Sequence, residues 1–343
     1  MSKIQELLKN RTDIIDLDYV EQNYPWLYEK NINCIISPDS DGFMCALLMS
    51  HYLDWNIKGF YDGKVMLYSS DVKPRDCVFL DMEIFNKNIR SVGQHCIIPY
   101  NKIYTELSLD GFDSCLSPGC LRGYDAHDGN FRLKFPLATI HFLISVLHRR
   151  FPIKINKTAI SSLLFVDGCF NVIFSYPENC LNWFKYLKID EHDNPLNTFF
   201  FKGDLPLGDV MKMMDNYFKI RDSFGNKEVG RGDHLVISDR NGELLNCTQD
   251  NGLYKINENN KNSIKQFIQM NAENFGWLFK DNWSWENLKF EKLQKKILGG
   301  EGNKKTFCQR NVREVYTENL VSNAVTASNR MEYSTTTNEN LFS

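Results

Sequence analysis

The sequence predicts an α/β fold: a mostly parallel sheet with helices on both faces, followed by a smaller mixed α/β C-terminal unit. Short apolar runs bounded by turn residues recur in the first half of the chain, at residues 34–37 and 76–80. Such runs are typical of parallel strands that are covered on both faces. Apolar segments of helical length follow, at residues 43–55 and 135–147, so strands and helices alternate.

Composition narrows the class of protein. The chain has 343 residues, of which 43% are hydrophobic and 24% charged, and its net charge of -3 argues against a protein that coats nucleic acid with a broadly basic surface. Ten cysteines occur without a Cys-x-x-Cys pair, which indicates reduced thiols. A polar N-terminus and the lack of a run of transmembrane length lead us to expect a cytoplasmic protein with no membrane partner.

The first strand leads into an acidic turn. Pro38 ends the strand, Asp39 and Asp41 follow it, and Gly42 lets the backbone turn into the helix at residues 43–55. Ligands of open α/β sheets bind beyond the carboxyl ends of the strands, which is where both acids are expected. Two interpretations remain open here: the acids cap the helix, or they bind a metal ion.

The elements that follow continue the alternation. We predict strands at residues 64–68, 76–81 and 96–99, and a helix at residues 84–92. Asp81 ends the second of these strands and should lie at the same edge of the sheet as the first acidic turn. Helix capping is the alternative interpretation of this residue as well.

Two further groups of polar residues are candidates for the site. Asp167 interrupts an apolar segment just before Gly168, and a buried carboxylate needs a donor or a cation. The loop-like stretch at residues 101–134 contains Arg122, a candidate phosphate contact, and His127, which with its acidic neighbours forms either a metal ligand or, the interpretation we favour, a solvated turn.

A polar break at residues 191–196 suggests a domain boundary. We predict an α/β domain at residues 1–190, a smaller α+β substrate or partner domain at 197–300, and a flexible polar tail at 301–343. Trp277, Trp283 and Trp285 form an aromatic cluster that we assign to the core of the second domain rather than to base stacking.

Three motifs carry a resemblance to a known family. Pro38-Asp39-Ser40-Asp41-Gly42 is followed by Val78-Phe79-Leu80-Asp81 and by Val166-Asp167-Gly168. In order and spacing the chain resembles the DHH superfamily of phosphoesterases, which includes single-strand exonucleases, oligoribonucleases and cyclic-dinucleotide hydrolases. The resemblance implies one or two Mn²⁺ or Mg²⁺ ions held by Asp39, Asp41, Asp81 and Asp167, an all-oxygen set that suits hard cations.

The chain departs from the family pattern at several positions. Ile35 and Ser37 stand where the family usually has a His or Asp. The Asp-His-His triplet is missing after the fourth strand, where Lys102 offers an amine that could hold a phosphate instead. His95 precedes that strand, and we expect it to be misplaced for the role of the missing histidines.

Two hypotheses about function follow. The first is a divalent-metal-dependent phosphoesterase, a phosphodiesterase or exonuclease, that acts on nucleotides or single-stranded nucleic acid. The second is a catalytically degenerate DHH-like subunit that binds or assembles within a nucleic-acid-processing or defence complex, through a protein partner or as a homo-oligomer. The surviving carboxylates favour the first, and the missing triplet favours the second.

Overall fold

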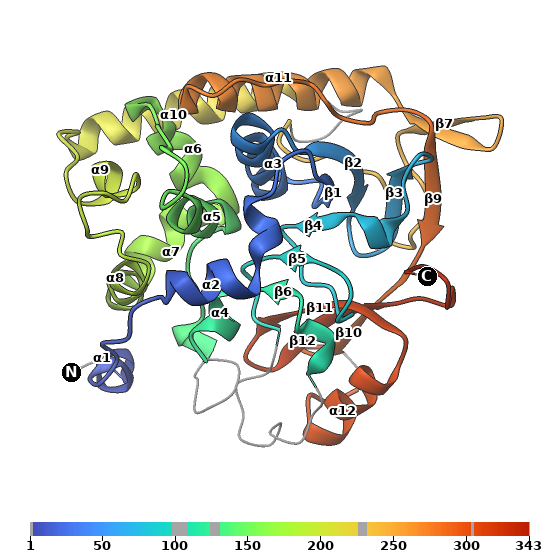
Figure 1. Cartoon of the computed structure of the whole chain (residues 1–343), viewed down its shortest axis with the longest axis horizontal. Helices are drawn as coiled ribbons and strands as arrows, with labels where there is room; N and C mark the ends of the chain where they lie inside the picture. The colour runs from blue at the N-terminus through green and yellow to red at the C-terminus, as the bar shows by residue number, and fades with distance from the viewer. Residues whose placement is uncertain (1–2, 98–108, 124–130, 226–231, 303–304, 343) are drawn as a thin grey trace.

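The structure is a computed structural model that describes residues 3–97, 109–123, 131–225, 232–302 and 305–342 (Figure 1). The predicted α/β class is confirmed: a nine-stranded mixed sheet is combined with helices and with a smaller three-stranded sheet. The large sheet contains β1 (Asn33–Ile36), β2 (Asn56–Tyr61), β3 (Val65–Ser69), β4 (Val78–Leu80), β5 (Ser91–Val92), β6 (Cys115–Leu116), β7 (Cys247–Asp250), β8 (Leu253–Ile256) and β9 (Leu288–Lys292). The small sheet contains β10 (Gln294–Gly299), β11 (Leu320–Ala327) and β12 (Arg330–Thr335).

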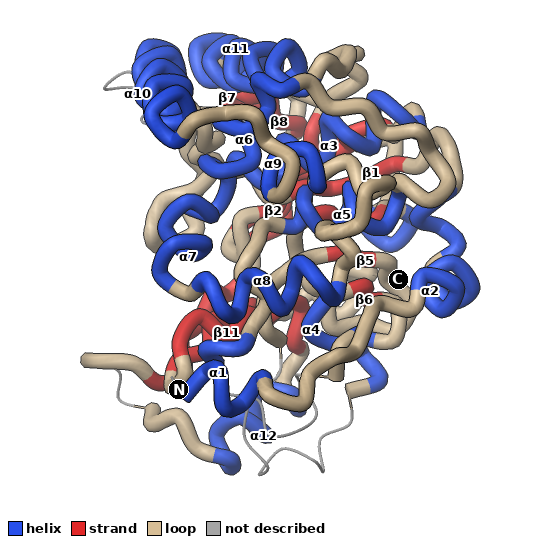
Figure 2. The backbone as a smooth tube through the Cα atoms, turned by 90° about the vertical axis from the view of Figure 1, so that its left-hand side faces the viewer, coloured by secondary structure: helices blue, strands red, loops and turns tan. Residues whose placement is uncertain are grey.

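The helices are distributed along the whole chain. They are α1 (Lys3–Leu8), α2 (Leu17–Asn23), α3 (Ser40–Leu53), α4 (Pro118–Leu121), α5 (Thr139–Leu147), α6 (Ile160–Phe165), α7 (Cys169–Ser175), α8 (Pro177–Tyr186), α9 (Asn197–Phe200), α10 (Leu207–Phe224), α11 (Glu258–Phe275) and α12 (Gln309–Thr317). The two longest, α10 and α11, run beside each other along one end of the molecule in both views (Figure 1, Figure 2).

The large sheet has a parallel half and an antiparallel half. Its strand order is β6-β5-β4-β1-β2-β3-β9-β8-β7. The strands from β6 to β2 are parallel, whereas β3, β9, β8 and β7 add antiparallel pairings. Ile36 at the end of β1 pairs with Leu80 at the end of β4. The two loops that carry the acidic motifs therefore leave the sheet side by side.

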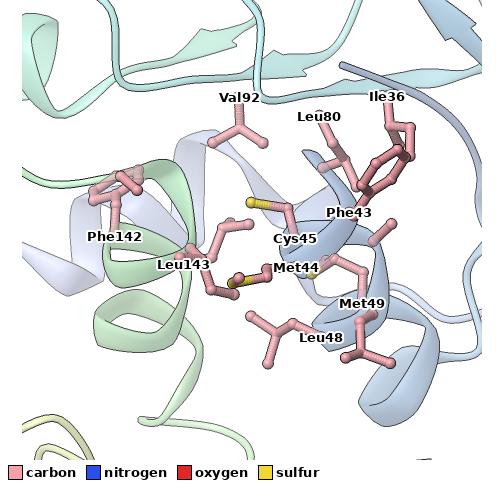
Figure 3. Close-up of a cluster of buried hydrophobic side chains, with 14 of the residues drawn as sticks. Ile36, Phe43, Met44, Cys45, Leu48, Met49, Leu80, Val92, Phe142 and Leu143 are labelled. Atoms are coloured by element: carbon pink, nitrogen blue, oxygen red, sulfur yellow. The ribbon is translucent and has the colours of Figure 1, made fainter. Parts of the chain in front are cut away.

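Helices cover one face of the parallel strands. Alternate residues of β1 and β4, such as Ile36 and Leu80, point toward α3 and α5. Figure 3 shows Ile36 and Leu80 above Phe43 and Cys45 of α3, with Leu143 of α5 alongside. Helix α3 is buried almost all round, as expected for a helix enclosed between a sheet and other helices.

The opposite face is covered by the C-terminal segment instead of the predicted second layer of helices. Ile35 and Phe79 point to this face and pack in one cluster with Val321 and Leu341. The ring of Phe342 meets that of Phe79 edge-on, with 6.0 Å between their centroids. Both faces of β1 and β4 are thereby removed from water, which explains their unbroken apolar runs.

The predicted flexible tail at residues 301–343 is corrected by this arrangement. Helix α12 and strands β11 and β12 lie within that range, and Val325, Met331 and Tyr333 are buried in a second hydrophobic cluster. The polar composition is misleading because buried and more exposed positions alternate at residues 321–326 and 330–333 of the two strands. Alternation of this kind makes a strand with one buried face.

The predicted boundary between a domain at 1–190 and one at 197–300 does not divide the sheet. Strand β9 pairs with β3 over five residues, from Val65 with Lys292 to Ser69 with Leu288. The polar segment 191–196 is instead a series of turns within one fold. Trp283 and Trp285 are stacked and buried against Phe60. The tryptophans are therefore core residues, as predicted, but of the main core and not of a separate second domain.

Several local predictions were wrong. Residues 84–92 form turns and the short strand β5 rather than a helix, because Ile84 and Ile89 enter the core from a turn. Strand β2 was not predicted. Residues 96–97 are irregular, and the rest of the strand predicted at 96–99 lies outside the described residues.

One segment of the described chain, Lys157–Ser175, is long and apolar enough to cross a membrane by length and composition, and half of its most apolar window is buried in the molecule. This corrects the expectation that no segment reaches that length. The backbone at Asp167, with a φ of 50°, divides the segment into α6 and α7. A buried core helix passes the same test of length and composition.

Candidate metal centre

Asp41 joins the first acidic turn to α5. It lies in the first turn of α3 and is buried. Its carboxylate accepts hydrogen bonds from the backbone N–H groups of Thr139, at 2.6 Å, and Ile140, at 3.0 Å. These are the first N–H groups of α5, which lack partners inside the helix. Asp41 therefore holds α5 against the end of β1. Its Oδ1 also accepts a hydrogen bond of 3.5 Å from Cys45 Sγ, so the lone pair left for another ligand is on Oδ2.

Asp81 and Asp167 approach Asp41 from two other elements. Asp81 follows β4, and its Oδ1 accepts a hydrogen bond of 2.7 Å from the Thr139 hydroxyl. Asp167 lies between α6 and α7, and its Oδ2 accepts one of 2.8 Å from the Gln94 amide. Both acids have left-handed backbones, with φ of 62° and 50°. Such conformations are uncommon outside glycine and gather at functional sites.

The three carboxylates form one group. Asp41, Asp81 and Asp167 each offer an oxygen, and these oxygens lie within 4.8 Å of one another. Burial raises the pKa of Asp81 well above its ordinary value, and the charges of Asp41, Asp39 and Asp167 raise it further. Burial raises the pKa of Asp41 too, a side-chain hydrogen bond with Asp81 lowers it, and the charge of Asp39 raises it further.

Asp167 is the member of the group that opens to solvent. Desolvation of its inner side, together with the charges of Asp41 and Asp39, raises the pKa of Asp167 to about 8. Fully ionised, the group places three like charges together, and a bound cation would offset them. The all-oxygen donors fit Mn²⁺ or Mg²⁺, and which ion binds stays a prediction.

Asp39 has a different position from the other acids. It is the N-cap of α3: its side chain accepts hydrogen bonds from Gly42 N, at 3.1 Å, and Ser37 Oγ, at 2.7 Å. Within the described part of the chain it does not belong to the group of ligand atoms within 4.8 Å. The structure thus brings together three of the four predicted ligands and places the fourth beside them as a helix cap.

Two cavities adjoin the group, and Asp39 and His234 line both of them. The first has a volume of about 330 Å³ and includes Asp81 and His95. The second has a volume of about 760 Å³ and includes Asp167. The acids therefore lie between two adjoining cavities, through which a ligand can reach them.

His95 was expected to lie outside the site, and the structure places it in the first cavity. Its Nδ1 is 3.2 Å from Oε2 of the buried Glu83, whose other oxygen accepts the backbone N–H of His95 at 2.7 Å. Burial disfavours the imidazolium, but the Glu83 carboxylate outweighs burial and raises the pKa of His95 to about 9. A side chain that is 40% exposed presents this positive charge to the cavity.

His234 was also missed as a site residue. The backbone N–H of Leu235 donates to the carbonyl of Pro38 at 2.9 Å, which lays the segment containing His234 along the first acidic turn. Because this contact joins residues almost two hundred positions apart, no local pattern reports it. The motif Gly232-Asp233-His234 is the only nearby sequence signal, and it is weak.

Arg122, the predicted phosphate contact, lies away from the site. Arg122 is buried, pairs with Asp13 at 2.8 Å, and stacks on the rings of Trp183 and Tyr186. It joins the N-terminal segment to α8, so its prediction as a phosphate contact is corrected. Lys102 and His127 lie outside the described residues.

Comparisons of the chain with protein-family models, with curated proteins and with solved structures returned no match. The resemblance of the three motifs to the DHH phosphoesterases therefore stays a prediction from the sequence.

Proposed function

We propose that the chain is a divalent-metal-dependent phosphoesterase that acts on nucleotides or single-stranded nucleic acid. The observation that carries the proposal is the group formed by Asp41, Asp81 and Asp167, whose oxygens lie within 4.8 Å beside two cavities. A solely structural role leaves unexplained why three carboxyl groups gather at one point of the fold, where burial and their mutual repulsion disfavour ionisation.

The residues divide into supports and reactive groups. Asp41, Asp81 and Asp167 would hold a divalent cation, which when bound supplies charge neutralisation at the phosphate and a more acidic water. Thr139 orients Asp81 through its hydroxyl, and the start of α5 orients Asp41. His95 stands in the same cavity as a protonated imidazole, held by Glu83, and is suited to protonate a leaving oxygen.

Hydrolysis of bis(p-nitrophenyl) phosphate and of a labelled short single-stranded oligonucleotide, each with and without Mn²⁺, tests the proposal. We expect Mn²⁺-dependent cleavage that Asp167→Asn lowers by about 100-fold or more. Asp250→Asn, an exposed acid in β7, is the matched control and should retain full activity. Equal activity in the two variants, or no cleavage of either substrate by the wild-type chain, would contradict the proposal.

The degenerate binding subunit remains the second candidate, favoured by one observation. Asp39 caps α3 and Asp41 holds the start of α5, so half of the predicted ligand set also has a structural task. In that case Asp41→Asn destabilises the fold, the wild-type chain cleaves neither substrate, and Mn²⁺ leaves its melting temperature unchanged. A rise in melting temperature with Mn²⁺ together with turnover would exclude this candidate.

A further inference from the structure

The larger cavity has an aromatic wall that the proposed chemistry does not use. Phe165 at the end of α6, Phe170 in α7 and Phe218 in α10 line it. The centroid of the Phe218 ring lies 5.9 Å from that of Phe165 and 6.1 Å from that of Phe170, both edge-to-face. Helices α6, α7 and α10 lie next to one another in both views (Figure 1, Figure 2).

Polar groups adjoin these rings. The guanidinium carbon of Arg221 lies over the rings of both Phe165 and Phe218, 5.2 Å from each centroid. Asp222 accepts hydrogen bonds from that guanidinium group and helps to hold it there. Asn171, an exposed residue of α7, adds an amide to the cavity lining. An amide carries both donors and an acceptor, as the edge of a nucleobase does.

The aromatic wall is continuous with the metal-binding group. Asp167, Asp39 and His234 line the same cavity as the three phenylalanines. Its volume of about 760 Å³ exceeds what a phosphate fills and suits a ligand of nucleoside size. Flat rings, a guanidinium plane and an amide together match a base, which stacks through its face and forms hydrogen bonds through its edge.

We propose that this cavity is a nucleobase subsite: Phe170 stacks the base of a nucleotide whose phosphate lies at Asp167, Phe218, whose ring stands at 70° to that of Phe170, packs beside the base, and Arg221 and Asn171 reach its polar edge. The inference rests on the proposed function in one respect, the placement of the phosphate. It assigns the substrate class as nucleotides rather than phosphorylated sugars or small phosphoesters.

Displacement of a fluorescent nucleotide tests the subsite without requiring turnover. The probe is 1,N6-ethenoadenosine 5′-monophosphate, bound to the full chain with Mn²⁺, and the competitors are AMP and ribose 5-phosphate. We expect AMP to compete about 10-fold or more better than ribose 5-phosphate, because only AMP carries a base. Equal competition by the two would overturn the proposal.

Substitutions in α7 test whether the preference for AMP comes from the aromatic wall of the cavity. Phe170→Ala should weaken AMP binding by about 10-fold, Phe170→Trp should restore it, and ribose 5-phosphate binding should not change. Phe174, also in α7, is 70% exposed and does not line the cavity, so Phe174→Ala is the matched control. Circular dichroism melting of each variant checks that it folds, and AMP binding unaffected by Phe170→Ala would overturn the subsite.

The outcomes for the subsite and for the function are separable. If the chain cleaves no phosphoester but binds AMP in this pattern, the proposed function fails and the subsite stands. If it cleaves bis(p-nitrophenyl) phosphate while AMP and ribose 5-phosphate compete equally, the function stands and the subsite fails.

Discussion

The two cavities differ in the walls that surround the same acidic turn. The smaller one is lined on one side by the C-terminal sheet, whose Lys295, Ser322 and Glu332 bring charged and hydroxyl groups to it. The larger one is walled by phenylalanines from α6, α7 and α10. Asp39 and His234 are common to both. A ligand held at the acids would therefore meet charged and hydroxyl groups at one end and aromatic rings at the other.

The largest expected effect comes from breaking the turn that both cavities share. A Cβ added at Gly42 would lie 2.0 Å from the carbonyl oxygen of Ser37. Gly42→Ala must therefore displace the turn that carries Asp39, and we expect a loss of about 3 kcal/mol in the free energy of unfolding together with loss of Mn²⁺ binding. Urea denaturation and calorimetric titration with Mn²⁺ measure the two effects.

Gly208 provides the matched control. It lies in the first turn of α10, and a Cβ added there meets nothing within 4 Å. Gly208→Ala should leave Mn²⁺ binding unchanged and stabilise the chain by up to about 1 kcal/mol. Equal effects of the two substitutions would show that the shared turn is not the common support of the cavities.

The next test separates the smaller cavity from the larger one. His95→Gln removes the imidazolium that Glu83 holds in the smaller cavity. We expect kcat for bis(p-nitrophenyl) phosphate to fall by about 100-fold, while Mn²⁺ and AMP affinities are kept. His192→Gln, at an exposed position, is the control, and unchanged kcat in His95→Gln would remove His95 from the reaction.

Helix α5, whose first N–H groups bind Asp41, contains a histidine that makes the stability of the fold depend on pH. His141, in α5, is fully buried, and burial lowers the pKa of His141 to about 4. In the unfolded chain the His141 imidazole is protonated below about pH 6.5, whereas in the folded chain it stays neutral down to about pH 4. The free energy of unfolding therefore falls as the pH falls through this range.

This histidine should account for about 2 kcal/mol of the stability lost between pH 7 and pH 5. His141→Phe should remove that part of the pH dependence, as followed by urea denaturation at several pH values, because phenylalanine takes up no proton. An unchanged pH profile in this variant would contradict the assignment.

The smallest expected effect concerns Tyr61 and Ser322, which line only the smaller cavity of the two. The hydroxyl groups of Tyr61 and Ser322 lie 2.7 Å apart and join β2 to β11. Tyr61→Phe should reduce the free energy of unfolding by about 1 kcal/mol and leave AMP affinity unchanged, since the aromatic cavity is on the other side of Asp39. Thermal melting measures the first effect, and loss of AMP binding would show that the two cavities are not independent.

What the sequence could predict was local. An apolar run that ends in a turn of acids and glycine is enough to predict β1, α3 and the position of Asp41. Asp81 could be placed at the same edge because parallel strands share their orientation, whereas Asp167, which lies between two helices, was joined to the other acids only through the family resemblance. Their approach to within 4.8 Å depends on left-handed backbones at both residues, which no local pattern reports.

The rest of the site depends on contacts between distant segments. The pairing of Glu83 with His95 depends on a turn that resembled a helix in its apolar spacing. The C-terminal segment at residues 301–343 has the composition of a disordered tail. It is buried because it packs on Ile35 and Phe79, which lie far earlier in the chain. The alternation of Met331 and Tyr333 with Glu332 was the signal that could have revealed it.

Mn²⁺ binding to the wild-type chain and to Asp81→Asn, followed by electron paramagnetic resonance of the free ion, tests the central claim most directly. Asp81 is the acid at the end of β4 that is buried among the other carboxylates. We predict saturable binding to the wild-type chain and to Asp250→Asn, and its loss in Asp81→Asn. Equal binding by all three, or binding by none, would contradict a metal centre at these acids.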